Sequence, residues 1–230
     1  MHIEVDAEGI DEIRVDCVAA EFELAFGGVE RATLDARGKH AEDWELHREG
    51  DSLIASPKER EKTAVNYKGP QVVLTLPESL NDGSVLLHAE VAASEFRAKG
   101  SFIALEVQLA ASKADIHAQT EQAKIELAAG SVRAKLLGVA QASLEVAAGE
   151  MLAWFQESAP SKLDISIAAG SAEVLLPDVP YQLSKSAVLG KFRSTLQHTA
   201  ASPNVVNAEV AAGKLTLTRS ADPGPGLGPF

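Results

Sequence analysis

Apolar and polar residues alternate over short stretches of this chain, and each stretch ends in a run of small residues. In one copy Ile125 and Leu127 are apolar, Lys124 and Glu126 are charged, and residues 128–130 read Ala-Ala-Gly. Alternation with a period of two is typical of a β-strand with one buried face. Because the alternation resumes after the small residues, each copy predicts two short strands joined by a tight corner.

The corner signature is an aliphatic residue followed by Ala-Ala and then Gly or Ser, and it recurs along the chain. The copies occur at residues 91–94, 109–112, 127–130, 146–149, 167–170 and 210–213. Their first alanines lie 18, 18, 19, 21 and 43 residues apart, and the last gap contains a degenerate copy at 188–190. Units of this length that hold two strands each can stack into a solenoid, in which equivalent positions form ladders about 4.8 Å apart.

The corner also has a fixed length between inward-facing residues. Val91 and Phe96 are five positions apart, and Cys17 and Phe22 repeat that spacing near the N-terminus. In a regular strand, residues five positions apart point to opposite faces, so the second residue would face outward. Both residues are apolar, so we expect one residue between them to sit in a bend that restores the inward direction. Small residues with a permissive backbone suit such a bend. The same template therefore extends the solenoid back to Ile13.

These patterns predict an all-β, single-domain β-solenoid that resembles a β-helix, with rungs of 18–23 residues over 1–219. The regular rungs occupy residues 83–219, while 28–82 form an irregular insertion. Within it, 44–47 and 52–55 predict a hairpin, and 71–77 predict a strand that ends at proline. We expect this insertion to cap or flank the solenoid and protect its open edge. Residues 220–230 form a Pro/Gly tail that we expect to be flexible.

Composition narrows the range of partners. Among 230 residues, 46% are hydrophobic and only 5% aromatic, which favours a narrow interior built from small side chains. The formal charge of −12 argues against nucleic acid as a partner. The single cysteine, Cys17, excludes an intrachain disulfide. The chain shows neither a signal peptide nor an apolar stretch of membrane-spanning length, so we expect a cytoplasmic protein without membrane insertion.

Motifs for catalysis or cofactor binding are missing from the sequence. Nucleophile-elbow, phosphate-loop and dinucleotide signatures are absent. The histidines show no metal-ligand spacing; they are His2, His40, His47, His88, His117 and His198. We therefore predict no catalytic, cofactor-binding or metal-binding residue, and no enzyme activity.

One outward ladder is rich in carboxylates. It contains, at the same place in successive repeats, Glu90, Gln108, Glu126, Glu145, Ser166 and Glu209. Glu126 and Glu145 are neighbours in this ladder and could bind a cation, but we interpret the row as a solvated acidic stripe. Two further ladders predict opposite charges on adjacent rungs: Arg97, Asp115 and Arg133 in one, and Glu106 beside Lys124 in the other.

Two proline-ended strands, at residues 72–78 and 173–178, each lead into the repeat pattern. Together with the rung pattern, they resemble the bacterial "putative adhesin" β-strand-repeat family, which is related to the β-solenoid domains called toastracks. The resemblance covers roughly residues 10–219. It implies a β-solenoid whose biochemical role is unsettled and often linked to the cell envelope, and it supplies no catalytic residues.

Two hypotheses for function follow. The first is a non-enzymatic structural or protein-interaction solenoid that binds a protein partner or a second copy of itself and is linked to cell-envelope processes. The alternative is a carbohydrate-binding or carbohydrate-active β-helix, in which a groove would be lined by Glu126 and Glu145 together with Trp154 and Phe155.

Overall fold

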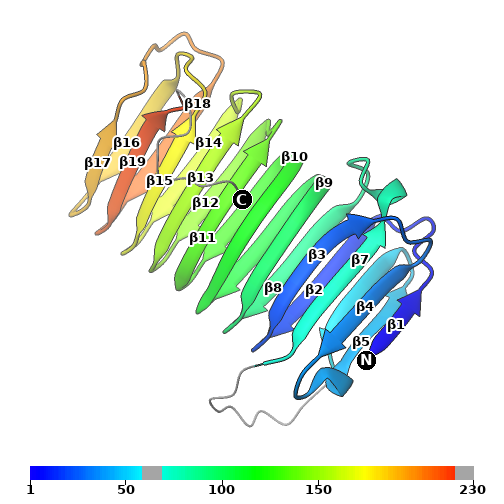
Figure 1. Ribbon diagram of the computed structural model, residues 1–230. Helices are drawn as coiled ribbons and strands as arrows, with labels where there is room; N and C mark the ends of the chain where they lie inside the picture. The colour runs from blue at the N-terminus through cyan, green and yellow to red at the C-terminus, as the bar shows by residue number, and fades with distance from the viewer. Residues whose placement is uncertain (59–68, 221–230) are drawn as a thin grey trace.

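The computed structural model describes residues 1–58 and 69–220 and shows a β-solenoid with two parallel faces (Figure 1). In the rungs whose corner is described, one strand lies on the first face, the chain turns at the small-residue corner, and the next strand lies on the second face. Nearly all strand pairs between rungs are parallel and in register. The predicted all-β solenoid is confirmed.

The first face contains the strands that precede each corner. Listed from the N-terminal end of the stack, they are β6 (Ser52–Pro57), β2 (Glu12–Val18), β8 (Leu86–Ala92), the second half of β9 (Glu95–Ala110), the second half of β10 (Ser112–Leu127), β12 (Gln141–Val146), β14 (Lys162–Ile167), β18 (Val205–Val210) and β16 (Gln182–Ala187). Each strand pairs in parallel with the next in this order.

The second face contains the strands that follow each corner. In the same direction they are β7 (Gln71–Pro77), β3 (Glu21–Gly27), the first halves of β9 and β10, β11 (Gly130–Leu137), β13 (Glu150–Gln156), β15 (Ser171–Leu176), β19 (Lys214–Arg219) and β17 (Lys191–Ser194). Because β9 and β10 bend through a second corner, each of them contributes to both faces.

The stack does not follow sequence order at either end. The rung of β2 and β3 lies between the rung of β6 and β7 and the rung that begins with β8. At the other end, β18 and β19 pair directly with β14 and β15, and the earlier strands β16 and β17 form the outermost rung. The degenerate copy at 188–190 is thus a genuine corner, but it belongs to the terminal rung and not to the gap between its sequence neighbours.

The N-terminal end is covered by antiparallel strands. β5 (Trp44–Glu49) forms the predicted hairpin with β6, and β4 (Ala32–Arg37) lies antiparallel to β7. β1 (His2–Val5) pairs antiparallel with β4. Two short 3-10 helices, η1 (Ala41–Asp43) and η2 (Glu78–Leu80), complete the region. The segment 28–82 therefore caps the stack with β4 and β5, and it also extends the stack with β6 and β7.

The domain boundaries at 28–82 and 83–219 stay a prediction, and most of the proposed tail, residues 221–230, lies outside the described residues. No helix in the described part of the chain has the length and apolar character needed to cross a membrane.

The core is a narrow column of aliphatic side chains between the two faces. Ladders such as Cys17, Val91, Leu109, Leu127 and Val146 run along the stack with each member buried. An aromatic cluster lies toward the N-terminal end, where the Phe22 ring lies 5.5 Å from Trp44 and 6.0 Å from Phe96 between centroids. Small side chains elsewhere let the two faces approach closely, as the composition predicted.

Corners stack on one another through main-chain contacts. A Cβ at Gly149 would lie 2.4 Å from the Gly130 carbonyl oxygen, and one at Gly213 would lie 2.1 Å from that of Gly170. Two solutions to the bend occur: Ala93 and Ala111 adopt positive φ before a serine, whereas Gly130 and Gly149 adopt it themselves. At these four corners the extra residue of strand phase is absorbed in a left-handed position, whereas the corners at 167–170 and 210–213 contain no residue with positive φ.

We expect Gly149→Ala to lower the free energy of unfolding by at least about 2 kcal/mol, because it combines an unfavourable φ with a main-chain clash. Gly28→Ala is the matched control, since nothing lies within 4 Å of a Cβ there and its φ is ordinary. It should change stability by no more than about 0.5 kcal/mol. Urea midpoints measure both, and equal midpoints for the two variants would contradict the role of the corner.

Candidate functional site

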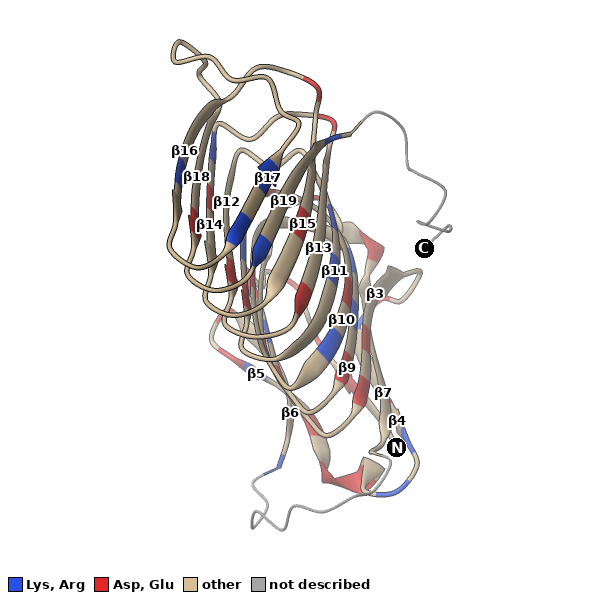
Figure 2. Cartoon of the chain, turned by 90° about the vertical axis from the view of Figure 1, so that its left-hand side faces the viewer, with Lys and Arg blue, Asp and Glu red and all other residues tan. Residues whose placement is uncertain are grey.

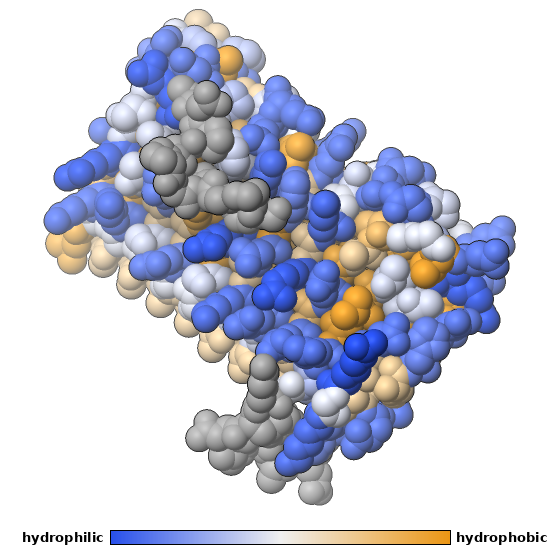
Figure 3. Space-filling model, in the orientation of Figure 1, coloured by the Kyte–Doolittle hydropathy of each residue, from blue (hydrophilic) through white to orange (hydrophobic). Residues whose placement is uncertain are grey.

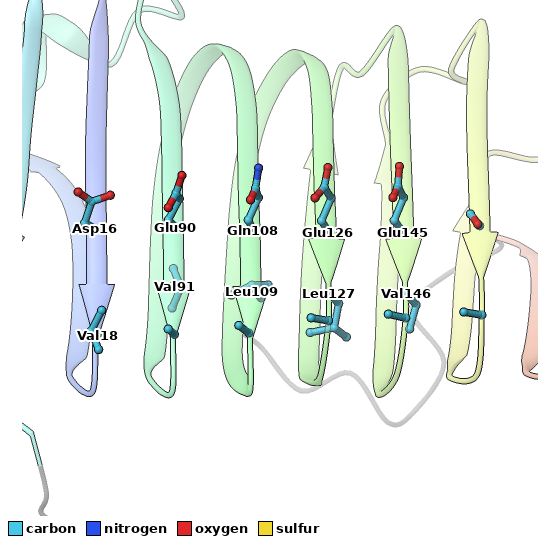
Figure 4. A pocket seen from close by; sticks show the side chains of 16 residues that line it. Asp16, Val18, Glu90, Val91, Gln108, Leu109, Glu126, Leu127, Glu145 and Val146 are labelled. Atoms are coloured by element: carbon cyan, nitrogen blue, oxygen red, sulfur yellow. The ribbon is translucent and has the colours of Figure 1, made fainter. Parts of the chain in front are cut away.

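A row of polar side chains runs along the first face, one residue before the last inward position of each strand. Asp16, Glu90, Gln108, Glu126 and Glu145 are paired in register across β2, β8, β9, β10 and β12. Figure 4 shows them side by side and pointing the same way. The parallel register places neighbouring members about 4.8 Å apart. The predicted ladder from Glu90 to Glu209 is confirmed, and Asp16 extends it by one rung.

The row forms one wall of a shallow groove that follows the corner. The floor consists of the small residues that begin each corner, and the hollow has a volume of about 490 Å³. These residues are Val18, Ala92, Ala110, Ala128, Ala147 and Ala168. Figure 3 shows a line of pale, weakly hydrophobic side chains along the lower edge of the molecule, where these corners lie. The groove is therefore acidic on one side and apolar on the other.

A lysine and a histidine lie beside two carboxylates of the row. Lys124 Nζ lies 2.6 Å from Glu126 Oε1, and His88 Nε2 lies 3.6 Å from Glu90 Oε1. At the N-terminal end, desolvation and the adjacent Glu90 carboxylate raise the pKa of Asp16 above its ordinary value. The row could bind an extended segment that is cationic or rich in hydrogen-bond donors, if the spacing of its groups matches the spacing of the rungs.

Among the described residues that line the groove, one bears a hydroxyl: Ser166, which is exposed and pairs in register with Glu145. The two serines of the corners are buried and bonded to main chain: the Ser94 hydroxyl donates to Ala92 O at 2.8 Å, and that of Ser112 to Ala110 O at 2.9 Å. Their ladder holds successive corners together. These hydroxyls are structural, because burial and main-chain partners leave them no access to a ligand in the groove.

The aromatic pair of the carbohydrate hypothesis does not line this groove. Trp154 and Phe155 lie on β13 of the second face, and both are buried. The indole Nε1 donates to the Ser220 hydroxyl at 2.9 Å, and Lys135 Nζ lies 5.4 Å from the centroid of the ring. The sequence could not exclude a shared groove, because it does not reveal that Trp154 is covered.

A histidine–carboxylate group at η1 escaped the sequence analysis. One ligand atom each from His40, Glu42 and Asp43 lies within 4.8 Å of the others. His40 Nδ1 and Asp43 Oδ2 are 3.2 Å apart, so an ion pair within a surface turn already accounts for the cluster. In the sequence these residues form the run His-Ala-Glu-Asp. The run alone does not show that the three side chains are close, because it is the 3-10 turn that brings them together.

The terminal rung is the most exposed part of the stack. β16 and β17 each pair on one side only, and most of their residues are exposed. Their corner presents Val188 and Leu189 with 79% and 84% of the residue surface exposed, the largest values among the large hydrophobic residues described. Lys185 occupies a position that is an inward aliphatic residue or alanine in the neighbouring rungs. In the sequence, the alternation of apolar and polar residues is interrupted at 182–190, and this interruption marks the exposed terminal rung.

Comparison with known proteins identifies the fold. No family model matches the sequence, and no curated protein does. The structure is similar to a crystal structure described as a "putative adhesin" from Bacteroides fragilis NCTC 9343, with a TM-score of 0.57 and 9% identity over 95% of this chain and 96% of that one. It is also similar to a "putative adhesin" from Parabacteroides distasonis ATCC 8503, with a TM-score of 0.53 and 12% identity over 95% and 96% of the chains. At these identities the likeness shows a shared fold.

Asp16→Asn should stabilise the protein at neutral pH. Because the folded pKa of Asp16 is raised, the folded state binds more protons between the unfolded and folded pKa values, so wild-type stability falls as pH rises through that window. The asparagine variant lacks this loss. Its advantage is present above the folded pKa and disappears as pH falls below the unfolded value. Thermal melts over a pH series measure the difference.

Asp164→Asn is the control of opposite sign. Asp164 accepts a hydrogen bond from Asn207 Nδ2 at 2.8 Å, and this bond with the nearby Lys162 ammonium lowers its pKa. Its contribution to stability is present above the unfolded pKa and is lost as pH falls through the folded one. The variant should be less stable than wild type at neutral pH. The electrostatic account of the row is wrong if both variants shift stability in the same direction.

Cys17 should be inert in the folded protein. It is fully buried in the core, and desolvation raises the pKa of its thiol to about 11. We expect no reaction with a thiol reagent near pH 8 in the native state and a complete reaction in denaturant. Rapid native labelling, measured by absorbance of the released chromophore, would show that the first rungs open readily.

Proposed function

We propose that this chain is a non-enzymatic protein-interaction module that binds partners through the terminal rung of its solenoid. The observation that carries the proposal is the combination of two one-sided strands, β16 and β17, with the exposed apolar corner at Val188 and Leu189. An unpaired strand edge offers main-chain donors and acceptors to an incoming strand. Exposed large apolar side chains beside it supply the area that makes such pairing specific.

The second face of the solenoid supports this choice by contrast. Its ladder of Arg97, Asp115 and Arg133 alternates in charge from rung to rung, so Asp115 lies between two residues of opposite sign. Such exposed pairs contribute little free energy and leave a hydrated surface. The described "putative adhesin" structures share the fold, and their name is consistent with a binding role without specifying a ligand.

The carbohydrate hypothesis loses its main support in this arrangement. Aromatic rings that stack on sugars need an exposed face beside hydrogen-bonding groups, whereas Trp154 and Phe155 are covered and lie on the opposite face from Glu126 and Glu145. A role in cell-envelope processes remains part of the proposal and follows from the family resemblance alone.

Site-specific photocrosslinking tests the location of the interaction. Ser184 and Ser143 occupy the same ladder position, the first on the terminal rung and the second within the stack. With p-benzoyl-phenylalanine at position 184, we expect protein adducts in cells that are at least about tenfold more abundant than those from position 143. Mass spectrometry identifies the partner. Equal yields at both positions, or none at either, would refute an interaction at the terminal rung.

A further inference from the structure

Charge is strongly segregated between the two ends of the solenoid. Residues 1–57, which build the N-terminal end, contain fifteen acidic and five basic residues, a formal charge of −10. Residues 179–219, which include the two outermost rungs of the other end, contain one acidic and five basic residues, a formal charge of +4. The N-terminal end therefore carries the largest share of the negative charge, and the opposite end is cationic.

The outermost strands carry this difference themselves. β16 and β17 bear Lys185, Lys191 and Arg193, and residues 182–194 include no acid. Figure 2 looks toward this end and shows blue bands on β16 and β17. Each strand has a strand partner on one side only within the described chain. The edge thus combines unpaired main chain, exposed Val188 and Leu189, and three positive charges.

The N-terminal end presents matching features. β1 and β5 each have one strand partner among the described residues, so each has an outer edge without a strand. They bear the exposed acids Glu4, Glu45 and Glu49. The one arginine on these strands, Arg48, is held by local groups: its guanidinium donates to Glu8 O at 2.7 Å and to Gly50 O at 2.6 Å.

We infer that the partner of the terminal rung is the acidic N-terminal end of a second copy of this chain, which gives head-to-tail association along the solenoid axis. This inference rests on the proposed function and names the partner. It uses a different patch on each copy, and such a heterologous contact repeats without closing when the rotation between copies does not form a ring. Because both edges lie at the ends of one straight stack, the product is a linear chain of copies.

The position of Lys185 favours head-to-tail contacts between copies over contacts between two like ends. It stands where neighbouring rungs place Ala208 and Ile165, and its Nζ lies 5.2 Å from the centroid of the Phe192 ring, over the end of the core. An inward lysine on an edge strand blocks stacking on an uncharged edge, because the partner would bury the charge. It blocks tail-to-tail stacking more strongly, since two cationic edges repel. Two acidic N-terminal ends repel likewise, so the opposite ends are the remaining partners.

Light scattering and sedimentation of the purified chain at about 0.05 M and about 0.5 M salt test the inference. We expect species well above the single-chain mass of 24.2 kDa at low salt, with an association constant at least about tenfold weaker at high salt. Reversing the cationic edge with Lys185→Glu, Lys191→Glu and Arg193→Glu should leave single chains. Reversing the acidic edge with Glu4→Lys, Glu45→Lys and Glu49→Lys should do the same.

A mixture of the two reversed variants separates docking from misfolding. Each variant alone carries outermost strands of one sign, but a junction between the two variants again brings outermost strands of opposite charge together, so association should return in the mixture. The control reverses three exposed cations within the stack, Lys99, Lys113 and Arg133, and should associate as wild type. If an acidic-edge or cationic-edge variant unfolds, the neutral set Lys185→Gln, Lys191→Gln and Arg193→Gln should still weaken association about tenfold.

Several outcomes overturn the inference. Wild type that stays a single chain at about 100 µM and low salt is one of them. Undiminished association of a folded cationic-edge variant, or failure of two folded reversed variants to associate on mixing, is equally decisive. If purified chains stay single while position 184 crosslinks to a different protein in cells, the second copy is the wrong partner and the proposed function stands. Single chains without any adduct at position 184 overturn both.

Discussion

The contact between successive corners is the constraint on which the rest of the structure depends. Main-chain hydrogen bonds run from corner to corner, as from Ala147 N to Leu127 O at 2.8 Å and from Ala168 N to Val146 O at 2.9 Å. In the middle of the stack the carbonyls approach so closely that a Cβ at Gly130 or Gly149 would clash with main chain, and the serines at the third position turn their hydroxyls into the main chain. This contact fixes the register, because a slip of one residue would place a side chain against the main chain of the next rung.

Fixed register turns a repeating sequence into ladders on the outside of the molecule. Residues of one kind then lie at the rung spacing, which produces both the carboxylate row from Asp16 to Glu145 and the alternating charges of the second face. The row accumulates like charge, and burial together with the adjacent Glu90 carboxylate raises the pKa of Asp16 at its end. The alternating ladders avoid that cost, so the two faces present different electrostatic surfaces although one corner geometry builds both.

The order of the rungs along the chain differs between the ends of the stack and its middle. At both ends the chain places a rung out of sequence order, so that β2 and β3, and likewise β18 and β19, have neighbours on both sides. β16 and β17 are therefore held by chain at both of their ends. This arrangement suits an exposed edge, because a tethered strand loses fewer contacts by fraying than a free terminus would. The segregated charges lie on these outermost strands, where a partner would meet them.

The sequence by itself determined the strands, the corners, the inward positions and the local register. Those features depend on contacts between equivalent positions of repeated units, so alternation and spacing suffice to predict Cys17 above Val91 or Glu106 beside Lys124. The tertiary structure alone decided the order of rungs at the ends, the second corner within β9 and β10, and the covering of Trp154. A degenerate copy such as 188–190 fits equally well in either of two adjacent rungs, because both offer the same corner to pair with. Only the packing of the whole stack, with Lys185 tolerated at an open end and not inside the core, distinguishes them.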